Sequence, residues 1–232
     1  MLAAMAGRND GAFCRRIGML GVGMVTVGGI SVDEKTMSAS REMVRRGRKE
    51  FLFDDLHHFL EDHITQAQAS RARVCVNIRS ATLQGYVKAA EIITDLGAVV
   101  EVNAHCRQEE MITRGAGQHL LEDLHAFKRI IDALHDEGIR AIIKFRGNVS
   151  SERLLLETID PDVVHIDAYR EGEKGFDFSI FAKISDYSCF KIGNNSINTP
   201  EIARKVLRVC NAFSFAQIAW NEDTVRSLVG QV

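Results

Sequence analysis

The stretch Ala98–Gln108, AVVEVNAHCRQ, joins an apolar run to a cluster of polar side chains. Its first residues are small or β-branched, which is typical of a buried strand. Asn103, His105 and Cys106 follow where this strand is expected to end. In α/β proteins, ligands bind at the carboxyl ends of parallel strands. The stretch therefore predicts an α/β fold with a functional site beside Cys106.

The same alternation of short β-rich runs and longer helical segments continues along the chain. The expected strands are Leu2–Met5, Gly23–Val27, Val74–Ile78, Val99–Val102, Ala141–Lys144, Val163–Ile166, Cys189–Ile192 and Ser214–Ile218. The expected helices are Asp10–Ile17, Asp54–Gln68, Thr82–Leu96, Gln118–Glu137, Ser150–Thr158, Phe178–Ser185, Thr199–Val209 and Asn221–Val229. This pattern predicts a (β/α)₈ TIM barrel in a single domain, residues 1–232. An open doubly wound sheet is the competitor, but no GxGxxG follows the first strand.

Local signals support several helix ends. Thr199-Pro200-Glu201 places a cap residue before a proline at the first helical position. Gly97 and Gly138 fall just after helical runs, where a left-handed residue is expected. Residues 31–54 show the least clear pattern, and we expect an insertion or a mobile loop there.

The composition is that of a soluble globular protein. Among 232 residues, 46% are hydrophobic and 26% are charged, with a formal net charge of −2, so no global basic field favours nucleic acid. The basic run from Arg41 to Lys49 is expected to be a solvated helix face. Five dispersed cysteines without CxxC spacing argue against disulfides and a zinc site, and no metal ligands are predicted. Neither a secretory signal nor a membrane-spanning run occurs, so a cytoplasmic protein is expected.

Five segments, in chain order, resemble the dihydrouridine synthases, flavin-dependent (β/α)₈ enzymes related to the dihydroorotate dehydrogenases. LAAMAGRNDGAF (Leu2–Phe13) is similar to the family's LAPMAGVTD, and VEVNAHCRQEEMITRGAGQHLL (Val100–Leu121) to its IDINMGCP segment with the trailing GAG. IIKFR (Ile142–Arg146) resembles VTVKIR, VVHIDAYREG (Val163–Gly172) resembles the HGRT strand, and IGNNSINTPEIA (Ile192–Ala203) resembles the IxNGDI turn. Each match is expected at a strand end.

The resemblance implies an FMN-dependent oxidoreductase that reduces or oxidises the carbon–carbon double bond of a pyrimidine. Cys106 would be the proton donor or base, and His165 would lie near flavin and substrate as a second catalytic residue. The implied cofactor-binding residues are Met5, Ala6, Asn77, Lys144, His165, Asn194, Ala216 and Gln217. The implied substrate-binding residues are Asn103, His105 and Arg146. NADPH or NADH would recharge the flavin in the reducing direction.

The sequence also departs from the family pattern. His105 replaces the glycine of MGC, and Asp167 replaces the arginine of HGRT. Asn195 replaces a glycine of the IxNGDI turn, and Ala216-Gln217 stand where the family has a glycine-arginine pair that binds the FMN phosphate. The sequence reaches Val232, about one helix after the eighth expected strand, and we therefore expect the family's helical tRNA-binding domain to be lacking.

These departures leave three functional hypotheses open. The first is an enzyme of dihydrouridine synthase type, acting on a tRNA uridine or a small pyrimidine. The second is a dihydroorotate-dehydrogenase-like enzyme acting on a free small pyrimidine. The third is a barrel that has lost flavin and acts as a binding protein, in which Cys106 is a packing residue and His165 a core histidine. A homo-oligomer is compatible with the sequence, which does not determine the oligomeric state.

Overall fold

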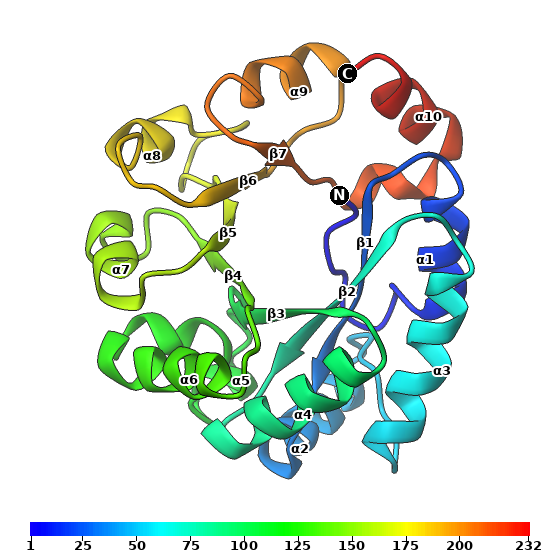
Figure 1. Ribbon diagram of the computed structural model, residues 1–232, viewed down its shortest axis with the longest axis vertical. Helices are drawn as coiled ribbons and strands as arrows, with labels where there is room; N and C mark the ends of the chain where they lie inside the picture. Colours follow the sequence, from blue (N-terminus) through cyan, green and yellow to red (C-terminus); the bar gives the residue numbers. More distant parts are fainter.

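The computed structural model describes residues 1–232 and contains one parallel sheet curled into a ring, with helices outside it (Figure 1). The strands are β1 (Met24–Ser31), β2 (Arg73–Arg79), β3 (Val99–Ala104), β4 (Ile142–Arg146), β5 (Val163–Asp167), β6 (Phe190–Asn194) and β7 (Ala212–Phe213). Each strand pairs with the next in chain order. The predicted α/β barrel in a single domain is therefore confirmed.

The ring closes through the first residues of the chain rather than through a full strand. Leu2 forms parallel bridges to Val25 on one side and to Phe215 on the other. The Ala3 N–H donates to the Phe215 carbonyl oxygen at 2.8 Å, and the Phe215 N–H donates to the carbonyl oxygen of Met1 at 3.0 Å. Leu2 thus occupies the first of eight strand positions, and the predicted strand Leu2–Met5 is reduced to a bridge.

Twelve helical segments connect and cover the strands. They are α1 (Gly11–Gly18), α2 (Glu34–Arg45), α3 (Leu56–Gln68), α4 (Leu83–Asp95), α5 (Glu109–Ile112), η1 (Gly117–Leu121), α6 (Leu124–Asp136), α7 (Glu152–Ile159), α8 (Phe178–Lys183), α9 (Pro200–Val206), η2 (Gln217–Trp220) and α10 (Glu222–Gly230). None of them combines the length and the apolar character needed to cross a bilayer.

Short polar side chains determine where most helices begin. The residue before the helix accepts a hydrogen bond from a backbone N–H of the first turn, which satisfies a donor that the helix leaves free. Thr199 does this for α9 as predicted, with Pro200 at the first helical position. Gly97 and Gly138 have φ of 74° and 73°, so both predicted left-handed residues after helices are confirmed.

Three predicted segments need correction. The segment 31–54 is not one loop, because Asp33 forms a capping box with Thr36 and starts the twelve-residue helix α2, so that after the helix only residues 46–54 remain irregular. The predicted helix Gln118–Glu137 is split, since Asp123 caps a new helix at Leu124. The predicted strand Ser214–Ile218 is displaced, because pairing ends at Phe215 and Gln217–Trp220 form the 3₁₀ helix η2.

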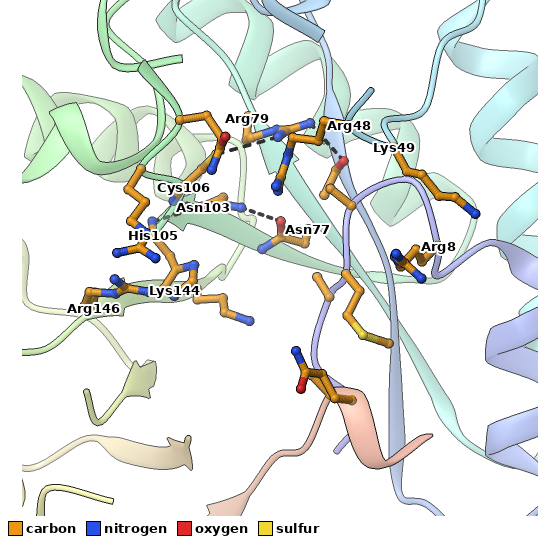
Figure 2. A pocket seen from close by; sticks show the side chains of 18 of the residues that line it. Arg8, Arg48, Lys49, Asn77, Arg79, Asn103, His105, Cys106, Lys144 and Arg146 are labelled. Carbon is orange, nitrogen blue, oxygen red and sulfur yellow. Dashed lines mark hydrogen bonds between the residues drawn. The ribbon is translucent and has the colours of Figure 1, made fainter. Parts of the chain in front are cut away.

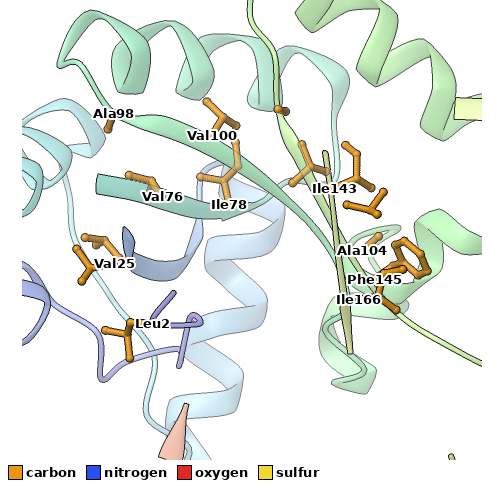
Figure 3. Close-up of a cluster of buried hydrophobic side chains, with 14 of the residues drawn as sticks. Leu2, Val25, Val76, Ile78, Ala98, Val100, Ala104, Ile143, Phe145 and Ile166 are labelled. Atoms are coloured by element: carbon orange, nitrogen blue, oxygen red, sulfur yellow. The ribbon is translucent and has the colours of Figure 1, made fainter. Parts of the chain in front are cut away.

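The hydrophobic core lies between the sheet and the outer helices (Figure 3). Val76, Ile78, Val100 and Ile143 are fully buried in it and come from neighbouring strands. Their alternate neighbours point to the barrel axis, where several side chains are polar. The outward-facing residues therefore carry the fold, while the inward-facing ones at the carboxyl ends of the strands are available for a site.

Candidate functional site

A cavity of about 1060 Å³ opens at the carboxyl ends of the strands (Figure 2). Its walls come from the segment after Leu2, the turn after α2, strands β2 to β4 and helix η2. No carboxylate lines it, but eight cationic side chains do: Arg8, Arg46, Arg48, Lys49, Arg79, Arg107, Lys144 and Arg146. The electrostatic character of this cavity therefore favours an anionic ligand.

The structure brings together most of the site residues expected from sequence. The cavity is lined by Met5, Ala6, Asn77, Asn103, His105, Cys106, Lys144, Arg146, Ala216 and Gln217. Two others lie apart from its lining. His165 is fully buried below it, and the Asn194 side chain accepts a hydrogen bond from the neighbouring Asn195 N–H instead.

The loop after β3 is held by the side chain of Asn103. Its Oδ1 accepts hydrogen bonds from the backbone N–H groups of His105 and Cys106 at 2.9 and 2.8 Å. Cys106 is 9% exposed as a residue and packs in a small apolar cluster with residues of α2 and α5, including Met43 and Met111. One face of the thiol is therefore packed, while the residue also lines the cavity.

A chain of hydrogen bonds runs below the cavity through the barrel interior. Asn103 donates to Asn77 at 2.7 Å, and Asn77 donates to Glu101 at 2.6 Å. The other oxygen of Glu101 contacts His165 Nδ1 at 2.6 Å, and His165 Nε2 contacts the Ser214 hydroxyl at 2.6 Å. The register pairs Asn77 on β2 with Glu101 on β3, whereas His165 lies two strands away on β5 and contacts Glu101 inside the barrel. The chain connects the eighth strand position to the loop that carries Cys106.

The charge states in this chain follow from its surroundings. Burial and the nearby Lys144 ammonium lower the pKa of His165 to about 4, so the imidazole is neutral at pH 7. Burial opposes ionisation of Glu101, but the nearby Lys144 ammonium and the hydrogen bonds from His165 and Asn77 outweigh this and lower its pKa to about 2. His165 Nδ1 therefore donates to the carboxylate, and Nε2 accepts from Ser214.

The order of Glu101, His165 and Ser214 matches that of a nucleophilic triad, but its placement does not. All three side chains are fully buried, and none lines the cavity. A substrate has no route to the Ser214 hydroxyl. We therefore assign this group to positioning, because its hydrogen bonds lead to Asn103 and the Cys106 loop.

Sequence reasoning missed a buried ion pair beside Cys106. Arg79 is 1% exposed, and its guanidinium donates to Glu50 at 2.6 Å and to the Gly29 carbonyl oxygen at 3.1 Å. Its other terminal nitrogen lies 3.7 Å from Cys106 Sγ. Arg79 follows Asn77 by two residues, so the alternation along β2 was the available signal. Its partner Glu50 lies in residues 31–54, where the sequence showed no clear pattern.

A second ionic group lies at the end of β5. His105 Nε2 lies 2.7 Å from Asp167, which also accepts from Arg146 at 3.2 Å. Burial lowers the pKa of His105, and the His105 and Arg146 contacts hold the pKa of Asp167 below its ordinary value despite burial. Asp167 carries a negative charge where the resembled family has an arginine, and Arg146 balances that negative charge within the structure.

Lys144 is the exception among these groups. It is 3% exposed and has neither a hydrogen-bond acceptor nor an ion-pair partner. Its side chain extends from β4 into the cavity (Figure 2). The ammonium is not itself enclosed by protein but opens to the cavity. A lysine buried along its stem, with its charge directed into a cavity, suits a site where a ligand supplies the opposite charge. Lys144 therefore marks the wall where part of a ligand would carry negative charge.

The FMN implied by the resemblance fits one end of this cavity. The ammonium of Lys144 and the remaining amide hydrogens of Asn77 and Asn103 suit the polar edge of a flavin ring. The residues to which the resemblance assigns the FMN phosphate do not form a phosphate site. Asn194 lies off the cavity lining, and Asn195 Nδ2 is used by the carbonyl oxygens of Ala168 and Gly175 at 3.1 and 2.9 Å. No lysine or arginine occurs at residues 192–196 or 214–218.

Comparison with known proteins gives one clear sequence relative. The uncharacterized protein MJ0144 of Methanocaldococcus jannaschii is 30% identical over 226 residues, covering 94% of this chain and 87% of that protein. No family model matches the chain.

Solved structures share the fold at low identity. An old yellow enzyme, TcOYE in complex with pHBA, has a TM-score of 0.69 at 11% identity, covering 97% of this chain and 86% of that one. A 2-naphthoyl-CoA reductase bound to 2-naphthoyl-CoA has a TM-score of 0.70 at 11% identity, covering 99% of this chain and 47% of that one. These similarities place the chain among TIM-barrel proteins.

Proposed function

The chain belongs to the family of the uncharacterized protein MJ0144, and we propose that it is an FMN-dependent oxidoreductase of dihydrouridine synthase type. It would reduce or oxidise the carbon–carbon double bond of a pyrimidine, either a small molecule or a uridine of tRNA. Among the structural neighbours, the old yellow enzyme and the 2-naphthoyl-CoA reductase support the oxidoreductase part of this proposal.

One observation carries the proposal: the buried, unpartnered Lys144 shares a cavity with Cys106. A cation at this place would stabilise the negative charge of a reduced flavin ring. A thiol in the same cavity provides a transferable proton. A structural role alone would not leave the ammonium of Lys144 without an acceptor.

Bound FMN would supply or accept the hydride at one carbon of the pyrimidine double bond. Cys106 would give the proton to the adjacent carbon in the reducing direction, or remove it in the oxidising direction. Asn103 would hold the Cys106 loop in place through the two backbone hydrogen bonds described above. A nicotinamide cofactor would serve as the electron donor in the reducing direction.

The binding-protein hypothesis remains the second candidate, because the implied phosphate end does not fit FMN. In that case Cys106 serves only the packing of α2 and α5, in the cluster that contains Met43 and Met111. The two candidates differ in one property that is simple to measure, namely whether the folded chain binds a flavin at all.

The test is a visible absorption spectrum of the purified protein, followed by titration with FMN. We expect a flavin spectrum, and FMN released on denaturation. Lys144→Met should weaken FMN binding about tenfold or more, since it removes a charged contact. Lys191→Met is the matched control, because Lys191 is also buried but donates to the Tyr187 carbonyl oxygen outside the cavity. A folded protein that takes up no FMN would overturn the proposal in favour of a binding role.

A further inference from the structure

The cationic side chains of the cavity lie on two opposite walls. Lys144 and Arg146 extend from β4 on one side, while Arg8 and Lys49 lie on the other (Figure 2). The closed order of the barrel accounts for this. Arg8 follows the first strand position, and β4 is the fifth of eight, so the two are diametrically opposed. A ligand that contacts both walls must be elongated.

The cations on the far wall differ in how their charge is balanced. Arg46 is paired with Glu110, and Arg48 is paired with Glu50 at 2.9 Å. Arg8 and Lys49 have no acidic partner. The Arg8 guanidinium lies 5.3 Å from the Trp220 ring centroid, which orients it without neutralising it. Two positive charges on this wall are therefore available to a ligand.

The turn that carries Lys49 is built into the structure. A Cβ added at Gly7 would lie 2.4 Å from the Lys49 carbonyl carbon, so the two backbones are in close contact. The next residue, Glu50, is buried between Arg48 and Arg79. These contacts hold the Lys49 backbone against the segment that carries Arg8. The backbone of this wall is thus fixed before any ligand arrives, so that binding would order only the two side chains.

From these features we propose that the cavity binds a phosphate-bearing ligand whose phosphate lies against Arg8 and Lys49. The ligand would span the cavity from this wall to Lys144. The inference rests on the proposed function in taking FMN as the first such ligand. It differs from the resemblance, which implies a phosphate site at Asn194, Ala216 and Gln217. Those positions offer no cation, whereas the far wall offers two.

The test compares the affinities of FMN and riboflavin, which differ only in the phosphate. In the unmodified chain we expect FMN to bind at least tenfold more tightly, because the phosphate gains charge-assisted hydrogen bonds. Arg8→Gln combined with Lys49→Gln should reduce this preference to about twofold or less, with riboflavin affinity unchanged. Arg45→Gln is the control for net charge, since Arg45 ends α2 but does not line the cavity. Gln217→Ala tests the strand-end site and should keep the preference.

Three results would overturn the inference. These are equal affinity for FMN and riboflavin in the unmodified chain, a preference that survives in the Arg8/Lys49 double variant, and a preference lost in Gln217→Ala. If neither flavin binds, the proposed function fails, and thermal melting with inorganic phosphate decides the anion site separately. Stabilisation by phosphate that the double variant loses would support the site, and no stabilisation of the unmodified chain would overturn it.

Discussion

Inside this barrel, a lower layer of polar side chains is buried beneath the cavity and an upper layer lines the cavity, and the two differ in how their charge is balanced. In the lower layer, Glu101, His165 and Ser214 are fully buried, and each has a hydrogen-bond partner. In the upper layer, Lys144 is nearly as buried but has none. Buried polar groups are normally satisfied within the fold. The difference supports a structural role for the lower layer and agrees with the ligand-binding role proposed for the upper layer.

The assignment of Cys106 to the upper layer gives the prediction with the largest expected effect. Cys106→Ala should lower turnover of a pyrimidine substrate about 10²- to 10⁴-fold, the usual contribution of a positioned acid or base. Flavin binding should not change, and Cys210→Ala, which alters a buried cysteine outside the cavity, is the control. Steady-state kinetics with FMN-loaded protein measure the effect. Equal turnover in the variant would show that Cys106 only packs against α2 and α5 and takes no part in proton transfer.

Arg79 tests whether the wall beside Cys106 depends on a closed ion pair. Arg79→Met leaves the buried Glu50 carboxylate with Arg48 as its remaining cationic partner. Loss of one member of a buried pair costs about 3–5 kcal/mol of unfolding free energy. Chemical denaturation measures the loss, and Arg79→Met combined with Glu50→Leu should recover part of it. A loss below about 1 kcal/mol would show that solvent reaches Glu50.

The lower layer should give the protein a pH-dependent stability. The pKa of His165 falls from 6.5 in the unfolded chain to about 4 in the fold, so between these values only the unfolded chain binds the proton. The contribution of neutral His165 to the free energy of unfolding is therefore complete above pH 6.5. About 3 kcal/mol of it is lost as the pH falls toward 4. Burial of His105 acts in the same direction. Denaturant unfolding at pH 4.5, 5.5 and 6.5 gives the slope of the unfolding free energy against pH, which should be smaller in His165→Gln than in the unmodified protein. An unchanged slope would show that His165 is not the source of the pH dependence.

The smallest expected effect comes from the far end of the lower layer. Ser214→Ala removes the donor to His165 Nε2 and leaves a buried nitrogen unsatisfied, at a cost of about 1–3 kcal/mol. Ser40→Ala is a matched control, since it breaks a buried hydroxyl pair with Ser31 away from the chain. Unfolding free energies measure both. If Ser214→Ala had the same unfolding free energy as the unmodified protein, the hydrogen-bonded lower layer would not extend to the eighth strand position.

The sequence by itself determined the barrel and the rows of residues at its strand ends. Alternating apolar runs encode strands locally, and a polar residue that follows such a run must lie at the carboxyl edge of the sheet. This reasoning placed Asn77, Asn103, Cys106 and Lys144 in one cavity. It needed no knowledge of which strands are neighbours, because parallel strands share that edge.

The tertiary structure decided which of those residues are satisfied by the protein and which are left for a ligand. His165 and Lys144 are register partners on β5 and β4, yet His165 is enclosed by Glu101 and Ser214 whereas Lys144 opens to the cavity. The partner Glu50 of Arg79 comes from residues whose position no local pattern revealed. Pairing between side chains distant in sequence depends on distances of a few ångströms across the barrel. Those distances arise only when the ring closes and α2 packs against it.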